Sequence, residues 1–241
     1  MEENPSVKEF HKKQQAEAQK VTNSLRDIIL GGQDGLVNSL GIIFGVSVAT
    51  PDVRILITTV LAAGIAESIS MGAVMYTSGH SQKDFYESQR RKEAKEIEKV
   101  PEMEKEEIRR IYAKKGLSGE ALEEIVKVIT ADKKVWLDVM MAEELRIEPV
   151  HAKAIWKSSV LVFASTAVGH LIPLLPFFFV AHVDGLVASI IISAISLFAV
   201  GAYQAITLVG SWWKTGLRIT AIGLIAAAAG YFVAKLFQTT V

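Results

Sequence analysis

Two acidic residues lie in apolar stretches that are long enough to cross a lipid bilayer. Asp34 and Glu67 each sit among aliphatic and small residues. A charge at the bilayer centre costs about 2.5–3.5 kcal/mol, so an acid in such a stretch is a candidate functional residue. Asn38 follows Asp34 by one helical turn, and Met71 and Met75 follow Glu67 at spacings of four, so each set shares one helical face. Together these side chains predict a path for an ion through the membrane.

The donor atoms on this path favour particular ions. Carboxylate oxygen beside thioether sulfur suits iron, manganese, cobalt and nickel, whereas calcium and magnesium prefer oxygen ligands alone. In the alternative interpretation, Met71 and Met75 only pack against other helices and Glu67 bonds a neighbouring serine. His170, in a later apolar stretch, is either a ligand or a hydrogen-bonded residue near a helix end, and Gln204 and Tyr203 could line a cavity.

A second set of acidic residues lies between the apolar stretches. Neighbouring members are three or four residues apart, a spacing that places side chains on one helical face. Three such helices could surround several divalent ions. The alternative is a solvated surface with weak ion pairs between these glutamates and the interleaved lysines and arginines. The predicted metal ligands are Glu93, Glu96, Glu104, Glu107, Met140, Met141, Glu144 and Glu148.

The elements that position these residues follow from the distribution of apolar and charged side chains. Half of the 241 residues are hydrophobic, yet residues 79–155 hold 16 of the 26 Lys and Arg and 17 of the 26 Asp and Glu. A bilayer crossing takes about 20 mostly apolar residues. The pattern predicts an all-α protein, a five-span transmembrane helical bundle with a polar helical insert between spans 2 and 3. The predicted spans are Ile28–Thr50, Ile55–Thr77, Ser158–Val180, Leu186–Val209 and Gly216–Phe237.

The insert is predicted to be helical throughout. Pro101 suits the first turn of a helix and Gly116 its end, while Ser118 and Asp132 are expected to cap the helices that follow them. The predicted domains are 1–80 (tail and spans 1 and 2), 81–151 (insert) and 152–241 (spans 3 to 5). The predicted insert helices are Ser81–Val100, Pro101–Lys115, Gly119–Ile129 and a last helix from Asp132 to Glu148.

Charge bias between the loops predicts the orientation in the membrane. The N-terminal tail carries five Lys and Arg and the insert sixteen, whereas residues 51–54 and 181–185 carry one between them. The positive-inside rule therefore places the N-terminus and the insert in the cytosol. The chain contains no cysteine, which excludes disulfides and thiolate metal sites, and its net charge of zero gives no sign of nucleic-acid binding. The N-terminus lacks the pattern of a cleavable signal peptide.

Several motifs resemble those of the vacuolar iron transporters and their yeast calcium-cross-complementing relatives. They occur in the family's order and cover nearly the whole chain. They are DGLVNS at 34–39 with Gly45-Val46, Ser70-Met71, SQKD at 81–84, WLDVMM at 136–141 with Glu144-Leu145, and LIPLLP at 171–176.

The resemblance implies a homodimer of five-span subunits with a cytosolic metal-binding domain. Such proteins export ferrous iron, often also manganese, from the cytosol in exchange for protons. It places Asp34 and Met71 on the ion path. The insert positions that it implies for metal binding are Glu93, Glu96, Glu104, Glu107, Met140 and Glu144. Met141 rests on its place beside the acids and Glu148 on helical spacing. It implies a transporter and no enzyme, with Fe2+ and Mn2+ as substrates and no prosthetic group. A prokaryote would hold it in the plasma membrane, and a plant or fungus in the vacuolar membrane.

One departure from the family pattern bears on the substrate. The family usually has a Gly-Glu pair after the Ser-Met element, whereas Val74 and Met75 stand there and an acid occurs at Glu67, one turn before Met71. Either the carboxylate has moved along the same face, or metal preference and proton coupling have changed.

Two other functions fit parts of the sequence. A metal sensor would bind ions through the insert without transporting them, although an anchor alone has no need for acids in its membrane spans. A ferritin-like di-iron oxidase would use Glu-x-x-His motifs on bundle helices.

Overall fold

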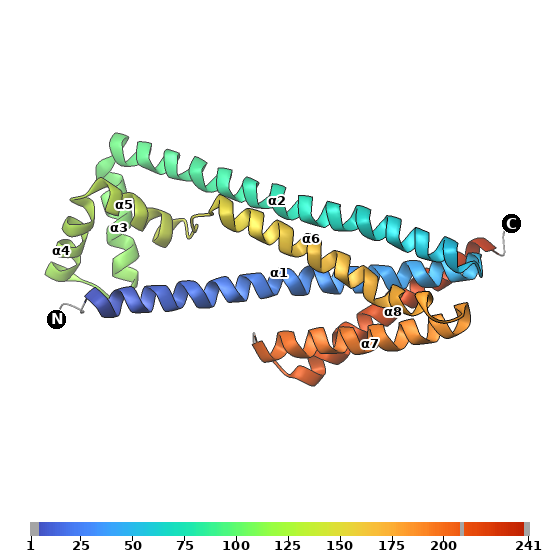
Figure 1. The fold of residues 1–241 in the computed structure, drawn as a ribbon. Coiled ribbons are helices and arrows are strands. Elements are labelled where there is room, and N and C mark those ends of the chain that lie inside the picture. The colour runs from blue at the N-terminus through green and yellow to red at the C-terminus, as the bar shows by residue number, and fades with distance from the viewer. Residues whose placement is uncertain (1–4, 208–209, 239–241) are drawn as a thin grey trace. The chain divides into compact units, whose positions relative to one another are not determined.

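The computed structural model describes residues 5–207 and 210–238, and all the regular elements within these ranges are helices (Figure 1). The all-α class predicted from the sequence is therefore confirmed. Five helices are long and apolar enough to cross a membrane, and each covers most or all of one predicted span. Thr50 follows the end of the first helix, and Phe179 and Val180 follow the end of the third. Leu208 and Val209, at the end of the fourth predicted span, lie outside the described residues. The five are Thr22–Ala49, Val53–Lys99, Ala152–Phe178, His182–Thr207 and Trp212–Phe237.

The chain divides into two compact units, and helix α2 runs through both. The first unit comprises residues 1–76 and 156–241, and the second is Thr77–Ile155. The first unit contains α1 (Pro5–Ala49), the beginning of α2 (Val53–Lys99), α6 (Ala152–Leu174), the short 3-10 helix η2 (Leu175–Phe178), α7 (His182–Thr207) and α8 (Trp212–Gln238).

Small residues let the helices of the first unit approach closely. A Cβ atom on Gly169 of α6 would lie 2.6 Å from the carbonyl oxygen of Gly32 in α1, so the two backbones are in contact. A Cβ on Gly230 of α8 would overlap the carbonyl oxygen of Gly41 in α1. Small residues at such crossings are typical of helix packing in membranes.

The outward surface of this unit is apolar. Ile65, Ile195 and Ile225 are 62%, 64% and 67% exposed although each lies in a candidate span. Exposed aliphatic surface of this extent is unfavourable in water and matches a lipid environment. The chain is therefore a multi-pass membrane protein.

The second unit is a group of short helices around an apolar core. It contains the end of α2, α3 (Pro101–Lys114), α4 (Gly119–Thr130), α5 (Lys133–Val139) and the π-helix η1 (Met140–Glu144). The core residues are Ile97, Ile108, Leu122, Val126, Ile129, Trp136 and Met140.

The helix boundaries in this unit follow local signals in the sequence. Pro101 is the first residue of α3, as predicted, and Gly116 has a positive φ of 96° just after α3 ends. Asp132 caps α5 by accepting hydrogen bonds from the backbone N–H groups of Lys134 and Val135. Ser118 precedes α4 as predicted, but its side chain makes no capping hydrogen bond.

The last insert helix is shorter than predicted. The prediction extended it to Glu148, whereas η1 ends at Glu144 and residues 146–151 form no helix. Arg146 has a φ of 54°, which breaks the right-handed helix, and a residue before proline, here Glu148 before Pro149, is disfavoured in the α conformation. Glu148 therefore lies outside the helix and is exposed.

Candidate functional site

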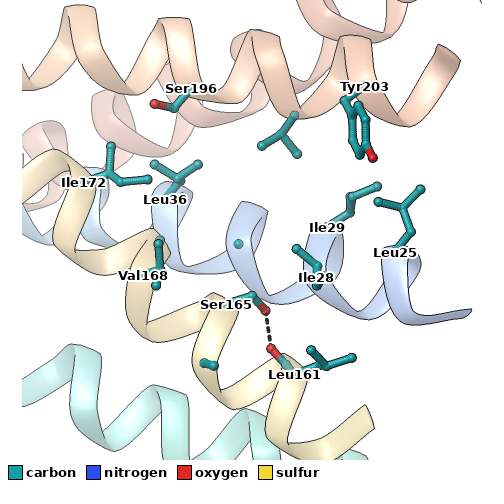
Figure 2. A pocket seen from close by; sticks show the side chains of 14 residues that line it. Leu25, Ile28, Ile29, Leu36, Leu161, Ser165, Val168, Ile172, Ser196 and Tyr203 are labelled. Atoms are coloured by element: carbon teal, nitrogen blue, oxygen red, sulfur yellow. Dashed lines mark hydrogen bonds between the residues drawn. The ribbon is translucent and has the colours of Figure 1, made fainter. Parts of the chain in front are cut away.

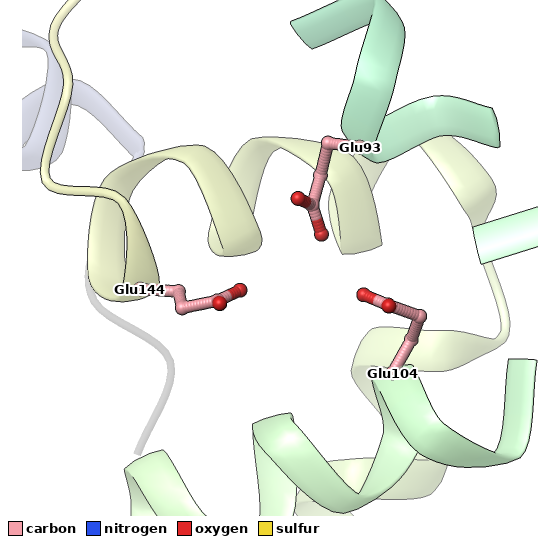
Figure 3. Close-up of side chains that lie close together, drawn as sticks. All are labelled: Glu93, Glu104 and Glu144. Carbon is pink, nitrogen blue, oxygen red and sulfur yellow. The ribbon is translucent and has the colours of Figure 1, made fainter. Parts of the chain in front are cut away.

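Three glutamates of the second unit converge from three different helical elements. Glu93 comes from α2, Glu104 from α3 and Glu144 from η1, and Figure 3 shows their carboxyl groups pointing toward one another. One oxygen atom of each lies within 4.8 Å of the corresponding atoms of the other two. Glu93 and Glu104 are each only 5% exposed. Three carboxylates this close repel one another, so the arrangement fits a bound cation.

The raised pKa values of the three glutamates show that a proton or a bound cation would stabilise the cluster. Burial, reinforced by the neighbouring carboxyl groups, raises the pKa of Glu93 to about 8 and that of Glu144 to about 7. Burial also raises the pKa of Glu104. Oε1 of Glu93 and Oε2 of Glu104 are buried without a hydrogen-bond partner. Buried carboxylate oxygens are normally satisfied, and a divalent metal ion would satisfy both at once.

Two more predicted ligands lie close to these three. Glu107 contacts Glu144 through a side-chain hydrogen bond and raises its pKa further, and Glu96 acts electrostatically on all three glutamates. Glu96 is also 3.6 Å from the ammonium group of Lys92. The cluster can therefore offer five carboxyl groups. Glu148 is not part of it, because it lies beyond the end of η1.

The two methionines of η1 are buried, and one has a clear packing role. Met140 is fully buried in the apolar core, and Met141 is 2% exposed. The π-helical turn that holds them also contains Glu144, its last residue. Such turns are rare and frequently occur at functional sites, because the extra residue per turn changes where a side chain points.

A second polar cluster lies among the membrane-spanning helices of the first unit. Asn38 Nδ2 in α1 donates a hydrogen bond to Oε1 of Glu67 in α2. Asp34, one turn earlier in α1, also makes a side-chain hydrogen bond with Glu67. The predicted path residues of the first two spans thus meet at Glu67, which has 21% of its side chain exposed.

A third helix contributes a residue whose role the sequence left open. His170 of α6 is 3% exposed, and its Nε2 atom is 2.9 Å from Oε2 of Glu67. Sequence spacing relates residues only within one helix, so it could not show that this histidine faces an acid 103 positions away. The sequence does carry one signal for a functional role of His170, which is that an ionisable residue lies within an apolar span directly after Gly169.

The methionines of the predicted path continue beyond this cluster. Met71 and Met75 are half-buried and follow Glu67 along α2, about 6 and 12 Å further on at 1.5 Å per residue. Their part in the path stays a prediction.

A cavity of the first unit is a different kind of site. It has a volume of about 400 Å3 and is lined by α1, α6 and α7 (Figure 2). Tyr203 lies at one end as predicted, whereas Gln204, which was predicted with it, is not among the residues that line this cavity. The polar Ser165 in its wall donates its hydroxyl to the carbonyl oxygen of Leu161. The remaining wall is almost wholly aliphatic, and no charged group lines it, so it offers no ligand for an ion.

Known proteins resemble this chain over most of its length. It is 32% identical over 215 residues to vacuolar iron transporter 1 of Arabidopsis thaliana, covering 89% of this chain and 86% of the relative. It is 33% identical over 217 residues to the vacuolar iron transporter of Centaurea cyanus, covering 88% and 87%. Protein CCC1 of Saccharomyces cerevisiae is 27% identical over 221 residues, covering 88% and 68%.

The sequence profile of the VIT family matches residues 25–235. This range contains both polar clusters and all five candidate spans except their outermost residues. The resemblance seen in the motifs is therefore confirmed, and the chain belongs to the VIT family.

Proposed function

We propose that the chain is a proton-coupled exporter of divalent transition metals, with ferrous iron as first substrate and manganese as second. The observation that carries this is the hydrogen-bonded cluster of Asp34, Asn38 and Glu67 within membrane-spanning helices. Acids are costly there unless they serve an ion or a proton. The names of the relatives, vacuolar iron transporters, agree with this substrate.

The acidic insert has a separate role in this proposal. Glu93, Glu104 and Glu144 would bind metal ions from the cytosol and raise their concentration near the transport path. Protons and metal ions compete for carboxylates, so a proton entering from the far side would release the ion from Asp34 or Glu67. The second unit would lie in the cytosol, and the protein would act as a homodimer in the vacuolar or the plasma membrane.

The test is ferrous iron flux into proteoliposomes with an imposed proton gradient. Wild type is compared with Asp34→Asn and Glu67→Gln, which keep side-chain size and remove the charge. Asp184→Asn is the matched control, because Asp184 is exposed at the start of α7 and away from the cluster. We expect gradient-dependent flux in wild type and in the control, and a loss of at least tenfold in the other two variants.

Other outcomes favour other functions. Flux that is indifferent to the proton gradient would contradict antiport, and flux of manganese without iron would change the preferred substrate. If no metal moves while the insert still binds metal, the protein is a sensor. A ferritin-like oxidase has little structural support. The sequence does contain one Glu-x-x-His spacing, Glu148 to His151, but it spans Pro149 in a stretch that is not helical.

A further inference from the structure

The imidazole of His170 occupies a space that two glycines create. A Cβ atom on Gly64 of α2 would lie 2.9 Å from the ring carbons of His170, and one on Gly35 of α1 would lie 2.9 Å from its Nδ1 atom. The ring is therefore held between α1 and α2, next to the cluster centred on Glu67. The hydroxyl of Ser39 donates a hydrogen bond to the backbone carbonyl of His170 at 3.1 Å, which ties α6 to α1 at this point.

A hydrogen bond fixes which ring nitrogen carries the proton. Nδ1 of His170 is 3.0 Å from the carbonyl oxygen of Thr166, and a carbonyl can only accept, so Nδ1 is the N–H donor. In the neutral ring, Nε2 then carries a lone pair. Metal-binding histidines are commonly oriented in this way, with the other ring nitrogen donating to a backbone carbonyl.

The lone pair of Nε2 has no partner apart from Glu67. Nε2 is buried, and Oε2 of Glu67 lies 2.9 Å from it, a pair that is ionic only when the ring carries a second proton. With a neutral ring and an ionised carboxylate, two lone pairs would face each other at this distance, so the contact needs either a proton or a metal ion on Nε2. Asn38 donates to the other oxygen of Glu67, Oε1, and so leaves Oε2 facing the histidine.

We propose that His170 Nε2 and Glu67 Oε2 form a nitrogen–oxygen ligand pair for the transported ion within the membrane. The proposal rests on the transport function proposed above and defines its substrate class. Imidazole suits iron, cobalt, nickel and zinc, whereas calcium and magnesium take oxygen ligands. His170 would therefore select transition metals against the more abundant alkaline-earth ions, and Asn38 would orient the carboxylate.

A purely structural histidine makes a different prediction. If His170 only fills the space between Gly35 and Gly64, its replacement lowers the transport of all ions in proportion and lowers the melting temperature. If it is a ligand, its replacement by an oxygen donor changes the preference among ions. His170→Gln offers an amide oxygen at a similar reach, which calcium accepts as well as iron does.

The first experiment measures selectivity in proteoliposomes. Fluxes of Fe2+, Co2+ and Ca2+ are compared for wild type, His170→Gln and the control His151→Gln, whose histidine is exposed just before α6. We expect the ratio of Co2+ to Ca2+ flux to fall at least tenfold in His170→Gln and to stay unchanged in His151→Gln. An unchanged ratio in His170→Gln would overturn the proposal.

The second experiment detects the nitrogen ligand directly. Mn2+ is added to the full-length protein in which Glu93→Gln, Glu104→Gln and Glu144→Gln remove the insert site, and nitrogen coupling is recorded by pulsed electron paramagnetic resonance. An imidazole nitrogen signal that disappears on adding His170→Gln supports the proposal. A signal that persists, or bound Mn2+ without nitrogen coupling, contradicts it. If wild type transports no metal at all, the transport function itself fails, which the flux assay shows separately.

Discussion

The clustered carboxyl groups of the insert make its stability depend on pH and on metal. Their pKa values in the folded state, about 8 for Glu93 and about 7 for Glu144, exceed the ordinary value of 4.5. Between pH 4.5 and 8 the folded state therefore binds more protons than the unfolded state, and the free energy of unfolding falls as pH rises. A divalent ion can replace those protons, so metal matters most at the upper end of this range.

This gives a prediction for hydrogen exchange of the full-length protein. In the presence of a chelator, residues 93–144 should be less protected at pH 8.5 than at pH 6, after correction for the intrinsic exchange rate. Saturating Mn2+ should restore protection at pH 8.5. Its affinity should rise about tenfold per pH unit for each proton that it displaces. Glu93→Gln should flatten the pH dependence, and protection that is independent of pH in wild type would contradict the prediction.

Met140 presents a choice between packing and metal binding that a pair of substitutions can decide. It is fully buried in the core with Ile108 and Trp136. Met140→Ala should cost about 2–5 kcal/mol of stability through the cavity that it leaves. Met140→Leu keeps the volume and removes the sulfur, so it should cost less than about 1.5 kcal/mol. Calorimetric Mn2+ binding to Met140→Leu completes the test, since a tenfold loss of affinity at unchanged stability would identify a thioether ligand.

At the scale of the helices, local sequence signals predicted most boundaries but not the contacts between elements. Pro101 and Asp132 begin or cap helices as predicted, because these effects depend on residues within one turn. The π-helical turn at Met140–Glu144 and the left-handed conformation of Arg146 have no comparable local signal. The prediction that the last insert helix extends to Glu148 was therefore wrong.

In both polar clusters, the sequence predicts which residues share a face of one helix but not which residues of different helices meet. Spacing grouped Asp34 with Asn38 on one helical face, and it suggested that Glu93 and Glu104 could share a pocket. Which face of one helix meets another depends on packing, here on the close approaches at Gly35 and Gly64. The convergence of His170 on Glu67 is a product of that packing and could not be read from either span alone.

The crossing of α1 and α8 offers a test of this packing with a matched control. A Cβ on Gly230 would overlap the carbonyl oxygen of Gly41, which is backbone and cannot move aside. A Cβ on Gly41 would lie 3.5 Å from the nearest atom, the carbonyl oxygen of Ala226, an ordinary contact. Gly230→Ala should therefore destabilise the protein by about 1–3 kcal/mol. Gly41→Ala should be neutral or stabilise it by up to about 1 kcal/mol, because alanine favours helix.

The measurement is thermal unfolding in detergent, in which the fraction of protein that remains monodisperse is recorded as the temperature rises. Equal melting temperatures for Gly230→Ala and wild type would show that α1 and α8 do not cross at these glycines. If only Gly230→Ala destabilises the protein, the effect comes from the helix crossing. If Gly41→Ala destabilises it equally, these helices do not tolerate substitution in general.

At the scale of the whole molecule, the proposed export requires the insert to face the cytosol. An odd number of spans places the two chain ends on opposite sides of the membrane, and five candidate spans are present in the described residues. The charge bias of the loops then decides which side holds the insert, because Lys and Arg near span ends are retained in the cytosol. If the insert faced outward, its acidic cluster could not collect ions for export.

The absence of cysteine from the sequence makes this orientation directly measurable. Ser118→Cys places a thiol in the insert, between α3 and α4, and Val183→Cys places one at the exposed start of α7 on the opposite side. In intact cells that carry the protein in the plasma membrane, a membrane-impermeant maleimide should label Val183→Cys, and Ser118→Cys only after permeabilisation. The cysteine-free wild type is the background control. The reverse pattern would place Glu93, Glu104 and Glu144 outside the cell, where they could serve uptake but not export.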